Sequence, residues 1–332
     1  MSNQHIDVIA TTISGSIKDW SKVGRIVPLF AEHGWSDVNL VAVNSHSEAQ
    51  RQTAQLVKEG SRIVISAGGS GTFNAVLEGI YEANVDMTQM RLGFLRKGSA
   101  DLIGKVLQMP DEIEEAIDVF VHSIKNDRVI PCDILEAVPA NAPERARRFV
   151  GYGGAELFGE IPRFTENRFM KYYKGVLSQL FGDKGPFAVG TGLTIAARFF
   201  RNLGRSGREW EILCDGRTIT SGRFQSLIIV NGDLGKDLPF AKGAALGSGD
   251  FYLITIRDLG QFKLIGQLKK SWDASIMDYA QEYGFEKHLI NDVLTMKTSD
   301  RGLFPLNVDG SILECNNQVT VRIVNQIQLL KR

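Results

Sequence analysis

The chain lacks the patterns that mark several broad classes of protein. Its 332 residues include only three cysteines, Cys132, Cys214 and Cys315, which stand far apart, so neither a disulfide framework nor a cysteine metal site is predicted. No stretch reaches the roughly 18 apolar residues of a membrane-spanning helix. The first residues, MSNQHIDVIATT, lack the basic region and the apolar run of a signal peptide. These absences predict a cytoplasmic protein.

The chain also lacks an excess of charge of either sign. Lysine plus arginine and aspartate plus glutamate both number 38. Bulk charge therefore gives no reason to expect nucleic acid or an anionic membrane as a partner. One local exception is the basic, aromatic stretch 163–181, which reads as a helix that either meets anionic lipid head groups or presents a solvated face. Peripheral contact with a membrane is the most that the sequence indicates.

Glycine is abundant, with 34 residues, and three of the glycines lie in the most informative stretch of the chain, residues 61–83. The run from Ile63 to Ile65 is typical of a buried strand, and from Phe73 onward apolar residues recur at the spacing of an amphipathic helix. Between strand and helix stand Gly68, Gly69 and Gly71. Glycines at such a turn let the backbone approach a ligand, and the N-terminus of a helix favours phosphate.

This turn differs from the two commonest nucleotide motifs. No lysine follows the glycines, as a P-loop requires, and their spacing is not that of a dinucleotide site. We expect Thr72 to cap the helix and to direct its hydroxyl toward a phosphate. The alternative is a tight strand-to-helix turn that binds nothing, because short connections of this kind also favour glycine.

The stretch resembles the G-G-D-G-T-x-N-E-V motif of the diacylglycerol kinase and sphingosine kinase catalytic domain, a relative of the NAD kinases. Six positions match: Gly68, Gly69, Gly71, Thr72, Asn74 and Val76. Two acidic positions of the motif are missing, because Ser70 stands in place of Asp and Ala75 in place of Glu.

Strands and helices alternate through the first half of the chain. Strands are predicted at 6–10, 38–43, 63–65, 91–95 and 129–138, with helices between them, and Ser45 with Glu48 forms a candidate capping box. This order predicts a doubly wound parallel sheet with helices on both faces. Ligands of such sheets bind at the carboxyl ends of the strands, so the loops around Ser14, Gly69 and Gly98 are expected to converge.

The resemblance extends to two of these loops. Ser14 and Gly15 match part of the family's N-P-x-S-G, and Gly98 matches part of its P-x-G-T-G, with Ser99 in place of the Thr. The resemblance implies that the nucleotide-binding residues are Ser14, Gly15, Gly68, Gly69, Ser70, Gly71, Thr72, Asn74, Gly98 and Ser99. The alternative at Ser14 is an ordinary turn. Arg96 and Lys97 stand beside the Gly98 loop, where cations favour phosphate, and the alternative is that both are solvated charges at the end of a strand.

The second half predicts a mainly antiparallel β domain. Asp215-Gly216 between two alternating runs predicts a hairpin. Gly154 and Glu156 stand at corresponding places of the segment N-x-x-x-G-F-D-A that opens the family's second domain. The nearest candidates for its metal-linked acids are Asp233, Asp237 and Asp250, and none lies in a motif that identifies a ligand, so the metal ligands stay unknown.

Asp309-Gly310 resembles the V-D-G-E of the family's active-site hairpin, with Ser311 in place of the Glu that is its candidate general base. We assign the catalytic role to Asp309, while a plain hairpin turn is the alternative. Serine at position 311 can neither hold Mg²⁺ as a carboxylate does nor act as a base unaided near neutral pH.

The resemblance implies two domains and a function. Residues 1–135 would bind nucleotide, with the C-terminal strands at about 320–332 folding back on them, and residues 136–319 would form a β-rich, lipid-binding acceptor domain. We expect an ATP-dependent lipid kinase that uses Mg²⁺ and transfers a phosphoryl group to a lipid hydroxyl such as that of diacylglycerol. The alternative is a catalytically degenerate member that binds nucleotide or lipid as a sensor or partner protein. Whether the chain forms a homodimer stays open.

Overall fold

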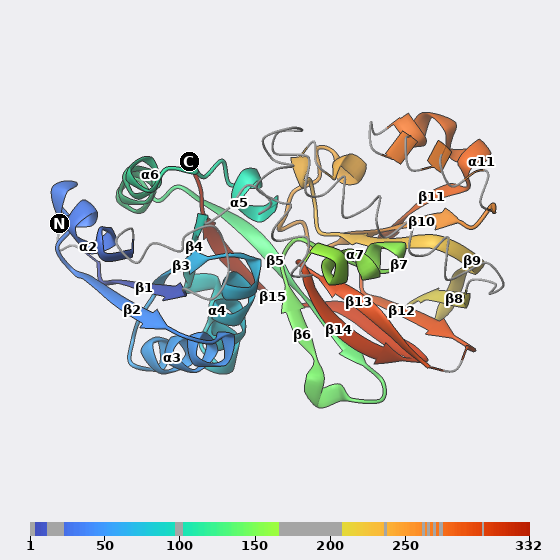
Figure 1. The fold of residues 1–332 in the computed structure, drawn as a ribbon, viewed down its shortest axis with the longest axis horizontal. Helices are drawn as coiled ribbons and strands as arrows, with labels where there is room; N and C mark the ends of the chain where they lie inside the picture. The colour runs from blue at the N-terminus through green and yellow to red at the C-terminus, as the bar shows by residue number, and fades with distance from the viewer. Residues whose placement is uncertain are drawn as a thin grey trace. The chain divides into compact units, whose positions relative to one another are not determined.

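The computed structural model describes residues 4–11, 23–96, 102–165, 208–235, 238–260, 275–300 and 302–332, together with residues 263, 266–267 and 270–271. The chain divides into two compact units (Figure 1). Unit 1 comprises residues 1–134, 245–247 and 324–332, and unit 2 comprises residues 135–244 and 248–323. Strands β5 (Val129–Pro139) and β15 (Gln318–Leu330) contribute residues to both units.

Unit 1 is built on a parallel sheet with the order β2-β1-β3-β4-β15. Its first four strands are β1 (Ile6–Thr11), β2 (Val38–Val43), β3 (Ile63–Gly68) and β4 (Arg91–Arg96). The predicted parallel sheet is therefore confirmed. Strands β1 and β3 are buried along their whole length, as the β-branched runs in their sequences require.

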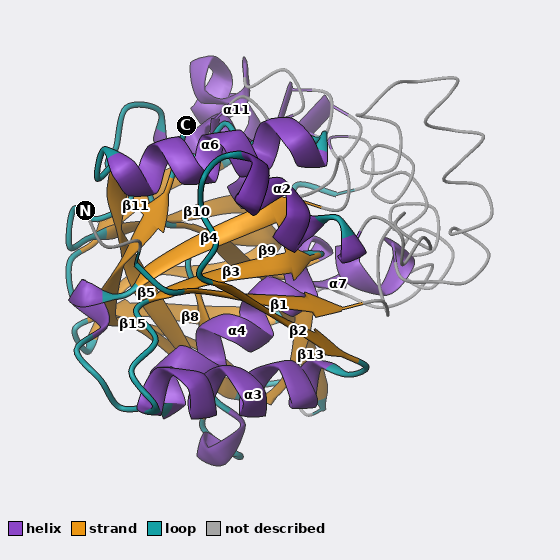
Figure 2. Cartoon of the chain, turned by 90° about the vertical axis from the view of Figure 1, so that its left-hand side faces the viewer, coloured by secondary structure: helices purple, strands orange, loops and turns teal. Residues whose placement is uncertain are grey.

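Helices cover both faces of this sheet (Figure 2). One face carries α3 (His46–Lys58) and α4 (Ser70–Glu82), and the other carries α2 (Ile26–Glu32) and α6 (Ile113–Lys125). A short helix, α5 (Leu102–Val106), precedes α6. The predicted capping box is present, because Ser45 Oγ accepts the Glu48 amide at 3.0 Å and Glu48 accepts the Asn44 amide at 2.8 Å.

Unit 2 consists mainly of antiparallel strands, as predicted. The pairing order is β14-β13-β7-β9-β8-β12-β15, and β10 pairs with both β9 and β11. The strands are β6 (Arg147–Phe149), β7 (Tyr152–Glu156), β8 (Glu209–Cys214), β9 (Arg217–Val230), β10 (Phe251–Arg257), β11 (Phe285–Ile290), β12 (Val293–Thr298), β13 (Leu303–Val308) and β14 (Ser311–Asn316). Its core holds large buried side chains such as Trp210, Phe224, Phe251 and Phe304.

Strand β9 differs from the sequence-based expectation. The sequence predicts two strands here, at 217–221 after the Asp215-Gly216 turn and at 224–230, but the structure has one. Its first half pairs with β8, and its second half lies between β7 and β10. Gly222, with a φ of +130°, lies between the two halves, so the chain changes partners there without leaving the sheet.

The remaining helical segments are short. Helix α7 (Leu157–Thr165) follows β7, and α11 (Ala280–Tyr283) precedes β11. Single 3₁₀ turns occur at Met87–Gln89, Pro143–Arg145, Pro239–Ala241 and Ser275–Tyr279. Within the described ranges, every helix is too short or too polar to cross a membrane. The sequence also predicts a helix at 260–272, and the described residues 263, 266–267 and 270–271 of this segment are helical. Most of the helix predicted at 163–181 lies outside the described residues.

Candidate functional site: the glycine turn and the β7–α7 junction

The glycine turn of unit 1 is shorter than its sequence indicates. Strand β3 continues to Gly68 and α4 begins at Ser70, so Gly69 alone connects them. Gly69 is the N-cap of α4 and has extended backbone angles (φ −90°, ψ −175°). The amides of Ser70 and Gly71 have no acceptor within the helix, because the first turn of any helix leaves such groups unpaired. They form the anion-attracting end of a 13-residue helix.

Thr72 has a different role from the predicted cap. It is fully buried, and its hydroxyl lies 2.7 Å from the hydroxyl of Thr11 at the end of β1. A Cβ atom at Gly68 would lie 2.3 Å from Thr72 Oγ1, so only glycine allows this approach. The prediction of Thr72 as the cap is wrong, because the side chain is drawn inward to tie α4 to β1.

His46 is a residue of this region that the sequence did not reveal. A Cβ atom at Gly71 would lie 2.7 Å from His46 Cε1, so the imidazole rests against the first turn of α4. His46 is the first residue of α3 and is exposed. A signal was available, since His46 follows strand β2, whose carboxyl end lies at the same edge of the sheet as that of β3.

The turn therefore collects Gly68, Gly69, Ser70, Gly71, Thr72 and Asn74 from the predicted nucleotide-binding residues. The other four, Ser14, Gly15, Gly98 and Ser99, lie outside the described residues. Their convergence with Gly69 stays a prediction.

In unit 2, Asp309 occupies the hairpin turn between β13 and β14. Asp309 and Gly310 have φ values of 44° and 84°, as in the favoured two-residue turn. The Asp309 carboxylate is 3% exposed and accepts the amides of Val150 (2.9 Å), Gly151 (3.2 Å) and Tyr152 (2.7 Å). The catalytic role of Asp309 stays a prediction, and these contacts favour a structural one.

Burial raises the pKa of Asp309 from 3.8 to about 6, although the three amide hydrogen bonds work in the opposite direction. The folded protein therefore binds a proton at Asp309 more readily than the unfolded chain does. The contribution of Asp309 to the stability of the protein must therefore fall as the pH rises from 3.8 toward 6, and stay lower above that range.

We predict that lowering the pH from about 7.5 to about 4.5 stabilises the wild-type protein by about 2 kcal/mol relative to Asp309→Asn. The asparagine has no titrating proton, so the difference between the two proteins isolates this carboxyl group. Urea denaturation at both pH values measures it. A difference that does not change with pH would mean that Asp309 has an ordinary pKa in the folded state.

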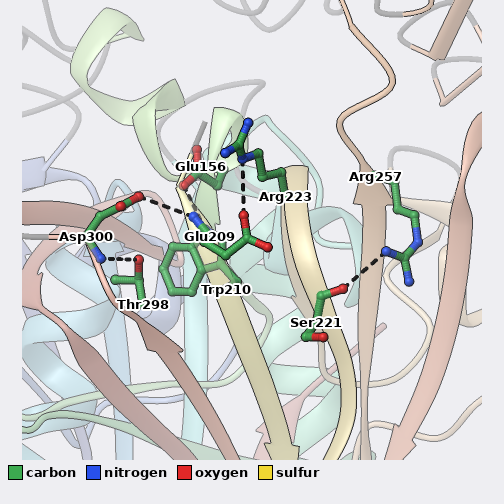
Figure 3. A network of polar contacts seen from close by, with 8 residues as sticks. All are labelled: Glu156, Glu209, Trp210, Ser221, Arg223, Arg257, Thr298 and Asp300. Atoms are coloured by element: carbon green, nitrogen blue, oxygen red, sulfur yellow. Dashed lines mark hydrogen bonds and ion pairs between the residues drawn. The ribbon is translucent and has the colours of Figure 1, made fainter. Parts of the chain in front are cut away.

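Glu156 lies where β7 ends and α7 begins. Its φ is +62°, which a residue with a side chain adopts at a cost on the order of 1–3 kcal/mol. Trp210, which is 1% exposed, donates its indole N–H to Glu156 Oε1 at 2.9 Å, as Figure 3 shows. The Trp210 ring meets Phe304 edge to face, with 4.9 Å between the ring centroids. A half-buried carboxylate is thus held on a strained backbone by a rigid aromatic donor.

Close backbone packing maintains this junction. A Cβ atom at Gly154 would lie 2.2 Å from the carbonyl oxygen of Leu227, and one at Gly159 would lie 2.2 Å from that of Pro305. Asn307 donates its side-chain amide to the carbonyl oxygen of Phe158 at 3.3 Å. Such strained positions persist only when their surroundings fix them, and they are frequent at functional sites.

Comparison with known proteins identifies the family. The family model of the diacylglycerol kinase catalytic domain matches residues 5–134. This part of the chain belongs to the diacylglycerol kinase catalytic domain family. Among curated relatives, the diacylglycerol kinase of Staphylococcus haemolyticus is 30% identical over 98 residues, and that of Staphylococcus carnosus is 29% identical over 93 residues. Each match covers only 29% of the relative's length.

Solved structures support the fold over the whole chain. A diacylglycerol kinase from Bacillus anthracis superposes with a TM-score of 0.64 at 14% identity, covering 100% of this chain and 98% of that one. An NAD kinase from Archaeoglobus fulgidus superposes with a TM-score of 0.52 at 10% identity, covering 98% of this chain and 93% of that one. Diacylglycerol kinases and NAD kinases therefore share the fold of this protein.

Proposed function

We propose that the protein is a divergent lipid kinase, which transfers the γ-phosphoryl group of ATP to the hydroxyl of a lipid such as diacylglycerol. The observation that carries this proposal is the turn at Gly69. It offers the amides of Ser70 and Gly71, which have no acceptor within α4, and neither Gly69 nor Gly71 adds a side chain to this N-terminus, where the imidazole of His46 lies against Gly71. The family assignment of residues 5–134 supports the same reaction class.

Unit 1 would bind the nucleotide. We assign the phosphates to the backbone of Gly69, Ser70 and Gly71, and we retain Ser14, Gly15, Gly98 and Ser99 as proposed contacts. A structure of the Archaeoglobus NAD kinase holds ATP, and its fold is shared here, which supports ATP as the donor. The buried hydroxyl of Thr72 would contribute to nucleotide binding indirectly, by fixing the position of α4.

Unit 2 would supply the group that accepts the proton of the acceptor hydroxyl. We assign this role to Glu156, because its carboxylate is half-buried and oriented by Trp210. A base must be accessible to its substrate. Asp309 meets this requirement poorly, because it is 3% exposed and three backbone amides bind its two oxygens.

The side chains of the described residues do not fit a resident Mg²⁺ ion. Nowhere in those ranges do three His, Cys, Asp or Glu side chains gather at metal-binding distance. Ser70, Ala75 and Ser311 replace three acidic residues of the family pattern, and Mg²⁺ prefers carboxylate ligands. Mg²⁺ would therefore enter with the phosphates of the nucleotide substrate.

The same three replacements favour a second candidate function. A protein that binds nucleotide or lipid as a sensor, without transfer, needs the glycine turn but none of those carboxylates. The cytoplasmic location and a homodimer stay predictions in either case.

Two measurements on the purified chain separate these functions. Calorimetric titration with ATP, with and without Mg²⁺, tests the donor site, and transfer of labelled γ-phosphate to diacylglycerol in detergent micelles tests the reaction. We expect binding with a dissociation constant on the order of micromolar and measurable transfer. ATP binding without transfer to any lipid acceptor would support the sensor, and no binding would refute the assignment of the turn.

A further inference from the structure

Strand β7 carries Glu156 at its end but has few side chains that could hold it in place. Its sequence is Tyr-Gly-Gly-Ala-Glu, so Gly153 and Gly154 contribute no packing. Its pairing with β13 is limited to these two glycines, opposite Val308 and Asn307. The position of the strand, and with it that of Glu156, must therefore depend on hydrogen bonds to its backbone.

Two side chains fix the backbone where β7 begins. Asp309 accepts all three amides of residues 150–152, and its own amide donates to the carbonyl oxygen of Tyr152 at 2.9 Å. Asn231 donates its side-chain amide to the carbonyl oxygen of Val150 and its backbone amide to that of Gly151, both at 2.8 Å. Asp309 and Asn231 thus provide a partner for every N–H and C=O group of three consecutive residues.

We call this arrangement the 309 clasp, defined by Asp309, Asn231 and residues 150–152. Its two side chains are deeply buried, with Asp309 3% and Asn231 0% exposed, and of residues 150–152 only Tyr152 is half-buried, so water replaces a lost hydrogen bond poorly. Hydrogen bonds to an ionised carboxylate are about twice as strong as those between neutral groups. Asparagine at position 309 has one acceptor oxygen in place of two and carries no charge, so it would hold the segment less firmly.

We propose that Asp309 is a positioning residue, which acts through the 309 clasp and strand β7 to orient the carboxylate of Glu156. The expected effect of Asp309 on phosphoryl transfer rests on the proposed function, whereas its effect on the position of Glu156 does not. The strand is continuous from Tyr152 to Glu156, and it pairs with β9 at each of these five residues. A shift at one end is therefore carried to the other along a paired backbone.

The indole of Trp210 provides a direct test in the intact chain. The protein has four tryptophans, so its ¹H–¹⁵N spectrum contains few indole signals, and Trp210→Phe identifies the one that reports the hydrogen bond to Glu156. We expect Asp309→Asn to move this signal in the direction in which Glu156→Gln moves it. Hydrogen exchange at residues 150–152 should become faster by about tenfold or more, as fits the loss of one buried hydrogen bond.

Asp215→Asn is the matched control. Asp215 also precedes a glycine in a hairpin turn, with a φ of 51°, and its carboxylate accepts the amide of Val293 at 2.9 Å. The same chemical change at this second turn should leave the Trp210 signal and the exchange at 150–152 unchanged. If Asp309→Asn fails to fold, Asn231→Ala weakens the same clasp without changing its charge, and it should move the Trp210 signal the same way.

The kinetic readout separates positioning from general damage. Asp309→Asn should lower kcat about tenfold or more, while KM for ATP and the signals of unit 1 remain as in the wild type. A Trp210 signal unaffected by Asp309→Asn and Asn231→Ala would overturn the inference, whatever the activity. A shifted signal in a protein that transfers no phosphate would uphold the clasp and refute the proposed function.

Discussion

Replacing Glu156 with glutamine is expected to lower the rate of phosphoryl transfer by about a hundredfold or more. Glutamine is nearly the same size and can still accept the indole N–H of Trp210, so the backbone at position 156 should be preserved. What is lost is a carboxylate that can take a proton from the acceptor hydroxyl. The effect should therefore fall on kcat, with ATP affinity unchanged.

Glu209→Gln is a suitable control for this variant. Glu209 adjoins Trp210 on β8, and its side chain is 56% exposed and pairs with Arg223 at 3.1 Å (Figure 3). Exposed ion pairs contribute little to stability, so this change should leave both activity and folding intact. Transfer by Glu156→Gln at a rate within about threefold of the wild type would exclude Glu156 as the base.

Local signals in the sequence were sufficient for the strands of unit 1. The β-branched run at Ile63–Ile65 and the Ser45–Glu48 capping box predicted β3 and the start of α3, because both depend on residues close together in the chain. The exceptions depend on distant contacts. Thr72 is not the cap of α4 because Thr11, far away in sequence, takes its hydroxyl.

In the candidate site, too, the sequence revealed what depends on neighbouring residues and missed what depends on distant contacts. The glycines at 68, 69 and 71 were found because their order follows a family motif, and Gly68 proves necessary for the contact with Thr72. Glu156 was noted in the sequence without a role, since its importance depends on a positive φ and on Trp210, which is 54 residues away. Asp309 carries a motif, but its three partners lie more than 150 residues earlier in the chain. No spacing rule could have assigned those hydrogen bonds.

Replacing Gly69 with valine is expected to weaken ATP binding by about a hundredfold or more while leaving the protein folded. Gly69 has extended backbone angles that valine adopts readily, so the backbone conformation does not require glycine here. Phosphate binding does require glycine, because a branched side chain at the N-cap would block access to the Ser70 and Gly71 amides. Each hydrogen bond to a charged phosphate contributes about 1.5–3 kcal/mol, and the loss of two gives the expected decrease in affinity.

Glu112→Val distinguishes this effect from a general loss of stability. Glu112 is the N-cap of α6 in the same unit and makes no side-chain capping hydrogen bond, like Gly69 in α4. Valine at either N-cap should cost similar stability, but α6 covers the face of the sheet opposite α4, so ATP binding should be retained (Figure 2). Calorimetric titration of both variants, after circular dichroism confirms their folding, provides the comparison. If Gly69→Val binds ATP within about threefold of the wild-type affinity, the phosphates must bind elsewhere, because the side chain would then block nothing that the ligand needs.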